Sequence, residues 1–213
     1  MKILFLMATE NNFHPGKLSS METLIMENGK VQKGFSKVFK VNEIIDYFQD
    51  KYKLTTEQNH SFSNNKKFEE YYLEIVELIE SADLIITFDY FDYYDIFFAK
   101  EFFLASPLYK THVMKLLHDK IIDLSIYKET HEDIYSFFKG FDKNLDTEIN
   151  IIKTKLYMMG ENRNLEDDPN KLRVVYLLLS FCMLVNKDIL TLNNNLETEV
   201  RSFINEFFGG KFF

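Results

Sequence analysis

Acidic side chains that directly follow short apolar segments are the residues of this chain best suited to do chemistry. Glu10 comes just after the apolar run at 2–8, and Asp92 lies just beyond the apolar residues 84–86. Carboxylates gathered around divalent metal ions can activate water and stabilise a leaving oxygen. Two carboxylates alone would bind at most one such ion, and weakly, so Glu10 and Asp92 by themselves would make at most a weak metal site.

The segment before Glu10 is expected to be the first of three antiparallel strands. Residues 2–8 are apolar nearly throughout, which is typical of a central strand buried on both faces. The segments 21–26 and 31–40 flank Asn28-Gly29. This pair favours a hairpin because a type I′ turn needs positive φ at both central residues.

Helices and two more strands are predicted to complete a mixed α/β domain. The clearest helix is 66–81, whose apolar residues recur at i, i+3 and i+4. The other predicted elements are strands at 83–88 and 120–127 and helices at 42–52, 93–104, 149–159, 171–184 and 197–208, the last closed by Gly209-Gly210. The predicted fold class is therefore α/β, with a domain at 1–186 and a C-terminal helix with an apolar tail at 187–213.

This order of segments resembles that of the DnaQ-like 3′–5′ exonucleases, a branch of the ribonuclease H-like superfamily. The resemblance covers about 2–127, with a weaker extension to about 185. These enzymes place four carboxylates around two metal ions. Their first motif, a strand running into Asp-x-Glu, corresponds best to Ala8-Thr9-Glu10. Glu10 then fills the glutamate position, and Ala8 replaces the aspartate that bridges both metals.

The second motif of the family matches around the second apolar segment. Phe91-Asp92 corresponds to a Phe-Asp pair before a helix, which implies that Asp92 occupies a catalytic position. Asp123, in the next predicted strand, matches an aspartate that is usually structural.

The third motif is His-x-x-x-x-Asp at the start of a late helix. Its best counterpart places Lys171 and Tyr176 where the histidine and the aspartate belong. A shifted register would instead bring Asp167 or Asp168 into the site, and Asp168 is the candidate third metal ligand. On the best alignment, two of the four family acids are missing.

Structural roles compete with these functional assignments. Glu10 also fits a solvated residue at a strand end, and Asp92 fits the N-cap of a helix that starts at Tyr93. Asp89 and Asp95 fit surface carboxylates. Aromatic faces can stack on bases, but core packing is the simpler reading of the aromatic run because no basic residues accompany it. That run consists of Phe88, Tyr90, Phe91, Tyr93, Tyr94, Phe97 and Phe98.

The overall charge and the reactive side chains exclude several classes of site. A formal net charge of −8 disfavours broad binding to nucleic acid, which needs lysine and arginine to neutralise phosphates, and it favours a protein partner. The single cysteine, Cys182, excludes an internal disulfide and a multi-cysteine zinc site, and its apolar surroundings predict a buried thiol. The chain has no Gly-rich phosphate loop, which disfavours a nucleotide-binding fold that merely shares this strand order.

A membrane partner is not expected. No stretch reaches the roughly 18–20 apolar residues that span a bilayer. The apolar start of the chain gives way at once to polar residues, so it is interpreted as a first strand and not as a signal peptide. We therefore expect a soluble cytoplasmic protein.

Two functional hypotheses follow from these observations. The first is a pseudoenzyme with an exonuclease-like fold, which binds a protein partner, a second copy of itself or a nucleic acid. The apolar tail at 207–213 would be unfavourable to expose and supports docking in such an assembly. The alternative is an active 3′–5′ exonuclease dependent on Mg²⁺ or Mn²⁺, in which Asp89, Asp167 or Asp168 joins Glu10 and Asp92 in a rearranged acidic site.

Overall fold

A computed structural model describes residues 1–10, 17–40, 65–131 and 169–208 of the chain. Within these residues, five strands form one mixed sheet in the order β3-β2-β1-β4-β5. The strands are β1 (Lys2–Glu10), β2 (Leu18–Glu27), β3 (Lys30–Val38), β4 (Leu84–Thr87) and β5 (Ile121–Asp123). The first three strands are antiparallel to one another, and β4 and β5 run parallel to β1. The predicted α/β class and the three antiparallel strands are confirmed.

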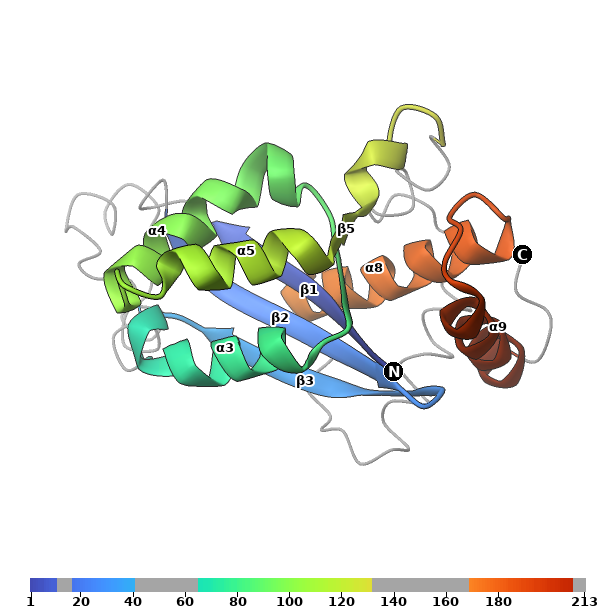
Figure 1. The fold of residues 1–213 in the computed structure, drawn as a ribbon, viewed down its shortest axis with the longest axis horizontal. Coiled ribbons are helices and arrows are strands. Elements are labelled where there is room, and N and C mark those ends of the chain that lie inside the picture. The colour runs from blue at the N-terminus through green and yellow to red at the C-terminus, as the bar shows by residue number, and fades with distance from the viewer. Residues whose placement is uncertain (11–16, 41–64, 132–168, 209–213) are drawn as a thin grey trace.

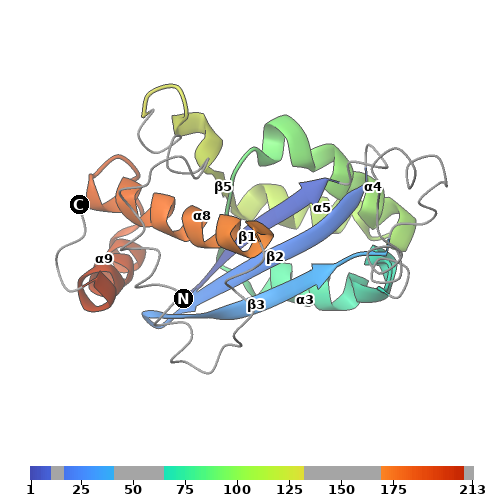
Figure 2. The ribbon, with the colours of Figure 1, turned by 180° about the vertical axis from the view of Figure 1, so that it is seen from behind.

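Helices cover both faces of this sheet (Figure 1 and Figure 2). The helices α3 (Tyr72–Ser81), α4 (Asp95–Ala105) and α5 (Lys110–Lys120) lie on one face. The helix α8 (Pro169–Asn186) lies on the other face, and α9 (Asn194–Phe208) packs against α8. The result is a three-layer arrangement in which the sheet separates two apolar cores.

The central strand β1 contributes to both cores, because successive side chains of a strand point to opposite faces. Ile3, Phe5 and Met7 belong to the core on the α8 face. Leu4, Leu6 and Ala8 belong to the core beneath α3, α4 and α5. This explains why 2–8 is apolar nearly throughout.

The helix α8 is buried on almost its whole circumference, because it lies between the sheet and α9. Its residues from Leu177 to Val185 are all buried, and the ring of Phe181 contacts Phe5 of β1 edge-on at 5.4 Å between centroids. A helix that is apolar all round is typical of such a position. Cys182 is fully buried, as predicted, and burial raises the pKa of its thiol.

The hairpin between β2 and β3 forms as predicted. Asn28 and Gly29 have φ angles of 51° and 70°, the positive values that a type I′ turn requires. Farther along β3, a Cβ at Gly34 would lie only 2.2 Å from Oγ1 of the buried Thr23, so this position excludes a side chain. A bulge at Thr23 accompanies this close approach of the two strands.

Several predicted boundaries are corrected by the structure. The helix predicted at 66–81 is a 3₁₀ turn, η1 (Phe68–Tyr71), followed by α3. The helix predicted at 93–104 begins earlier, with the π-helical turn η2 (Tyr90–Tyr94) before α4. The strand predicted at 120–127 ends at Asp123 and continues as the 3₁₀ turn η3 (Leu124–Tyr127). The helix α5 was not predicted, and the predicted helices at 42–52 and 149–159, as well as Gly209-Gly210, lie outside the described residues.

No helix in the part of the chain that the structure describes is both long and apolar enough to cross a membrane. The division into 1–186 and 187–213 stays a prediction.

Candidate functional site at the carboxyl ends of the parallel strands

The predicted site residues lie at the end of the sheet where the three parallel strands terminate. β1 ends at Glu10 and β5 at Asp123, and β4 ends two residues before Asp89. The chain leaves the adjacent parallel strands β1 and β4 in opposite directions, because β1 leads to β2 on one side and β4 leads to β5 on the other. In α/β sheets, the carboxyl ends of strands at such a switch in strand order leave a crevice that often binds ligands. We call the group Glu10, Asp89, Asp92 and Asp123 the carboxylate edge.

Asp123 has a structural role within the carboxylate edge. Its Oδ2 accepts a hydrogen bond of 3.0 Å from the backbone N–H of Phe91, and its Oδ1 accepts one of 3.0 Å from the N–H of Ser125. The side chain is buried. Asp123 therefore fixes η2 to the end of β5, which agrees with the structural role that the family resemblance implied.

Asp92 does not cap α4. The helical backbone already begins at Tyr90, and Asp92 lies in its first turn with its carboxylate exposed. Asp89 occupies the N-cap position of this turn in a left-handed conformation, with φ of 56°, and its side chain makes no capping hydrogen bond. The carboxylates of Asp89 and Asp92 are thus both left available for other partners.

Lys128 supplies that partner. Its Nζ lies 3.1 Å from Oδ2 of Asp92 and 3.7 Å from Oδ1 of Asp89, so one ammonium group bridges the two carboxylates. The hydrogen bond with Asp92 is the main reason that the pKa of Lys128 is raised, with the charges of both aspartates adding to it. A cation of the protein itself therefore contacts the acids that a metal site would need.

Of the two acids, Asp89 is the one whose charged form is disfavoured by its surroundings. Burial raises the pKa of its carboxyl above the usual range, and the charge of Lys128 opposes this. The neighbouring carboxylates of Asp123 and Asp92 raise it further. The carboxylate edge therefore retains some electrostatic repulsion despite the lysine.

Glu10 is contacted by a tyrosine hydroxyl. The hydroxyl of Tyr93 donates a hydrogen bond to Oε2 of Glu10. Next to it, burial raises the pKa of Tyr94, and a charge-assisted hydrogen bond with Arg173 of α8 opposes this rise. The charges of Asp89 and Glu10 also raise the pKa of Tyr94. The edge is therefore an interleaved set of acids, hydroxyls and two cations.

The two positions where the family acids are missing do not converge. Ala8 is buried in the core beneath α3, α4 and α5. Tyr176 packs against the core on the opposite face of the sheet, which contains α8. Asp167 and Asp168 lie outside the described residues, as does the side chain of Lys171. Among the residues that the structure describes, no three His, Cys, Asp or Glu side chains are grouped so that they could bind a metal ion.

The aromatic run next to the edge divides into buried and exposed members. Phe88, Tyr90, Tyr94 and Phe98 are buried, as the core-packing interpretation predicted. Phe91 and Tyr93 are 51% and 44% exposed. Two aliphatic side chains are also exposed, Ile96 in the first turn of α4 (70%) and Ile126 in η3 (67%). The edge is therefore bordered by exposed apolar groups.

Lys128, Tyr93 and Arg173 are the participants that the sequence did not reveal. The Lys128–Asp92 contact joins residues 36 positions apart, and the Tyr93–Glu10 contact joins residues 83 positions apart. Neither spacing has a periodic signature, because both depend on how strands and turns meet in space. Comparison with protein-family models, curated proteins and solved structures finds no match to this chain.

Proposed function

We propose that this protein is a catalytically impaired member of the DnaQ-like exonucleases, of the ribonuclease H-like fold, that acts as a binding or assembly module. Three antiparallel strands followed by two parallel strands, with helices on both faces, support that fold. The observation that carries the loss of catalysis is the ammonium group of Lys128 between Asp89 and Asp92. A lysine in this position neutralises the carboxylates and repels a divalent cation.

The remaining ligands of a two-metal site also support impaired catalysis. Glu10 is hydrogen-bonded by Tyr93, and Ala8 supplies no oxygen where the family has its bridging aspartate. Losing a bridging ligand removes several kcal/mol of transition-state stabilisation, so hydrolysis of a phosphodiester would be slight or absent.

The decisive experiment is a nuclease assay on end-labelled single-stranded DNA and RNA with Mn²⁺. The natural protein is compared with a Glu10→Ala/Asp92→Ala variant, and neither is expected to degrade the substrate. Degradation by the natural protein that disappears in the variant would establish the alternative, an active metal-dependent 3′–5′ exonuclease. Degradation that persists in the variant but disappears in Asp168→Ala would also overturn the proposal and assign the acidic site to Asp168.

The exposed apolar side chains beside the carboxylate edge support the binding role, and the first partner to test is a second copy of this chain. Ile96 and Ile126 are 70% and 67% exposed. Light scattering after size-exclusion chromatography measures the mass of the natural protein and of an Ile96→Glu variant. A dimer that the variant converts to monomer supports self-assembly through this surface, and a monomeric natural protein excludes it.

A further inference from the structure

A second charged region surrounds a small depression near the start of β2 and the end of β3. Lys17, Lys40 and Lys67 line it together with Glu69 and Glu101. Its empty volume, open solvent included, is about 310 Å³. Because much of this volume is open to solvent, the depression does not enclose a ligand, and a ligand would contact the lysines from outside.

Two more lysines extend this region over the face of one tyrosine. The Nζ atoms of Lys37 and Lys66 each lie 5.7 Å from the ring centroid of Tyr71. The ring of Tyr71 is fixed by an edge-on contact with Phe35, at 5.5 Å between centroids. We call the five lysines the lysine corner: Lys17, Lys37, Lys40, Lys66 and Lys67.

The backbone holds these lysines together. The N–H of Lys40 donates a hydrogen bond of 2.7 Å to the carbonyl of Lys66, which joins the end of β3 to the start of η1. The N–H of Lys67 donates one of 2.8 Å to the carboxylate of Glu70. Segments far apart in the sequence are thus brought to one place, and each carries lysines.

The ammonium groups of the lysine corner are only partly balanced by nearby carboxylates, since the charge of Lys17 lowers the pKa of Glu101. Among the described residues, none of the five lysines forms an ion pair. The chain as a whole is acidic, with a formal net charge of −8, so a group of unpaired cations at one place departs from its average composition. Their mutual repulsion would be relieved by an anionic ligand.

A protective role on an edge strand does not explain the lysine corner. Lysines on exposed edge strands oppose strand pairing between molecules, and Lys37 on β3 fits that role. Lys17, Lys66 and Lys67 lie outside the strands, where pairing is not at issue. A ligand is the interpretation that accounts for all five residues.

The type of cation favours phosphate over carboxylate as the ligand. Planar, two-point recognition of carboxylates is a property of arginine, whereas lysine acts as a point charge that commonly binds phosphate. The lysine corner has no arginine. A buried carboxyl group also lines the depression. Glu101 is only 4% exposed, and its carboxylate accepts a long hydrogen bond of 3.4 Å from the N–H of Leu18. When protonated, this carboxyl can donate a hydrogen bond to a phosphate oxygen.

We propose that the lysine corner binds the phosphate groups of a single-stranded nucleic acid. This inference deepens the binding role proposed above by naming a ligand class, and it concerns a surface distinct from the carboxylate edge. Each neutralised phosphate contributes about 0.7 to the slope of log affinity against log salt concentration for a single strand. Five lysines in contact with phosphates set an upper limit of about 3.5 for this slope.

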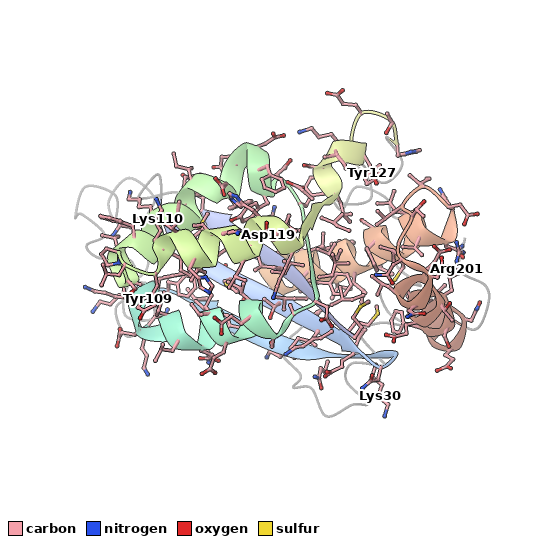
Figure 3. All side chains as sticks on the ribbon, in the orientation of Figure 1. Lys30, Tyr109, Lys110, Asp119, Tyr127 and Arg201 are labelled. Atoms are coloured by element: carbon pink, nitrogen blue, oxygen red, sulfur yellow. The ribbon has the colours of Figure 1, made fainter. Side chains whose placement is uncertain are left out.

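The test is fluorescence anisotropy with labelled single-stranded DNA and RNA, in EDTA, over about 50–200 mM salt. The variant Lys40→Gln/Lys67→Gln is compared with Lys30→Gln/Lys115→Gln, which removes the same charge elsewhere. Lys30 lies beside the hairpin turn, at the opposite end of β3 from the lysine corner (Figure 3). We expect about a tenfold loss of affinity and a slope smaller by about 1.4 in the first variant, with less than about a twofold loss in the control.

Several outcomes would overturn the inference. Equal losses in the two variants would mean that binding depends on net charge alone, and no binding by the natural protein would remove its basis. Competition by polyglutamate as effective as that by unlabelled DNA would indicate an acidic protein as the ligand. Binding of inorganic phosphate that unlabelled DNA does not displace would assign the depression to a free phosphate.

The binding test and the nuclease assay can fail independently. EDTA removes the metal on which hydrolysis depends, so residual catalysis cannot simulate or abolish binding. Nuclease activity in Mn²⁺ would overturn the pseudoenzyme proposal and leave the lysine corner intact. Absence of binding in EDTA would overturn only the inference about the lysine corner. Thermal unfolding of each variant shows whether it remains folded.

Discussion

The carboxylate edge and the lysine corner lie close together, but their charged side chains differ in whether they have partners of opposite charge. Glu10, at the edge, pairs in register with Leu18, which lines the depression of the lysine corner. At the edge, Lys128 bridges two acids and Tyr93 contacts a third. At the corner, five ammonium groups have no carboxylate partner among the described residues. The comparison teaches that the acids of the edge have a cation of the protein itself as a partner, whereas the lysines of the corner have no ion-pair partner among the described residues.

The largest expected effect comes from removing the residue that holds the carboxylate edge in shape. Asp123→Ala leaves the buried N–H of Ser125 and the partly buried N–H of Phe91 without their acceptor. We expect a loss of about 3 kcal/mol in the free energy of unfolding, because each unsatisfied buried donor costs about 1–3 kcal/mol. Chemical denaturation monitored by circular dichroism measures it.

Asp119→Ala is the matched control, because Asp119 is exposed near the end of α5 (Figure 3). It should change the free energy of unfolding by less than about 0.5 kcal/mol. Equal effects of the two substitutions would show that Asp123 does not fix η2.

A smaller effect of opposite sign is expected at the lysine corner. Burial raises the pKa of Glu101 above its usual value of 4.5, and the N–H of Leu18 and the charge of Lys17 only partly oppose this. The charged form therefore destabilises the folded protein once the pH exceeds the raised pKa. Glu101→Gln keeps the shape and the acceptor oxygen without the charge, and we expect it to stabilise the protein by about 1 kcal/mol at pH 7.

The pH dependence makes this prediction specific. A carboxyl whose pKa is raised on folding favours the folded state below its unfolded pKa, and this advantage is lost as the pH rises through the folded value. The gain from Glu101→Gln should therefore disappear below about pH 4.5, the usual pKa of the group. Melting temperatures of the natural protein and of Glu101→Gln, measured between pH 4 and pH 7, test this pH dependence. A constant difference across this range would mean that packing, and not charge, causes the change.

The substitution with the smallest expected effect on stability separates the two regions by their affinity for cations. Lys128→Met removes the ammonium group between Asp89 and Asp92, and Lys115→Met removes an equal charge from an exposed position on α5. We expect Mn²⁺ to bind the first variant about thirtyfold more tightly than the natural protein, since one unit charge repels a divalent ion by about 2 kcal/mol at about 4 Å in water. Isothermal titration calorimetry measures the affinity. Unchanged affinity in Lys128→Met, or the same gain in Lys115→Met, would show that the lysine does not block a metal position.

Elements with a strong local pattern could be predicted from the sequence. The apolar run of β1, the Asn28-Gly29 turn and the apolar segment of α8 all form as expected, because each pattern depends on neighbouring residues. The helix α5 was missed, since it is largely polar and buries only Val113, Met114 and Leu117. Its packing against α4 and α3, and not its own periodicity, determines its position.

The sequence indicated where the acids lie but not which residues contact them. Glu10 ends β1, and Asp92 lies in η2, which follows the adjacent strand β4. Lys128 directly follows η3 and Arg173 lies on α8, and only the three-dimensional arrangement brings them to these acids or to Tyr94. The lysine corner has the same origin, because Lys17, Lys40 and Lys67 lie on three separate segments.

The burial of Cys182 gives the protein a built-in reporter of its own stability. It is the only cysteine in the chain, and it lies inside α8 with no exposed surface. A thiol reagent can reach it only when α8 separates from the sheet and from α9, so the labelling rate depends on how often this opening occurs. Modification rates measured in native buffer therefore give the free energy of opening for the α8 layer, without an introduced label or a denaturant.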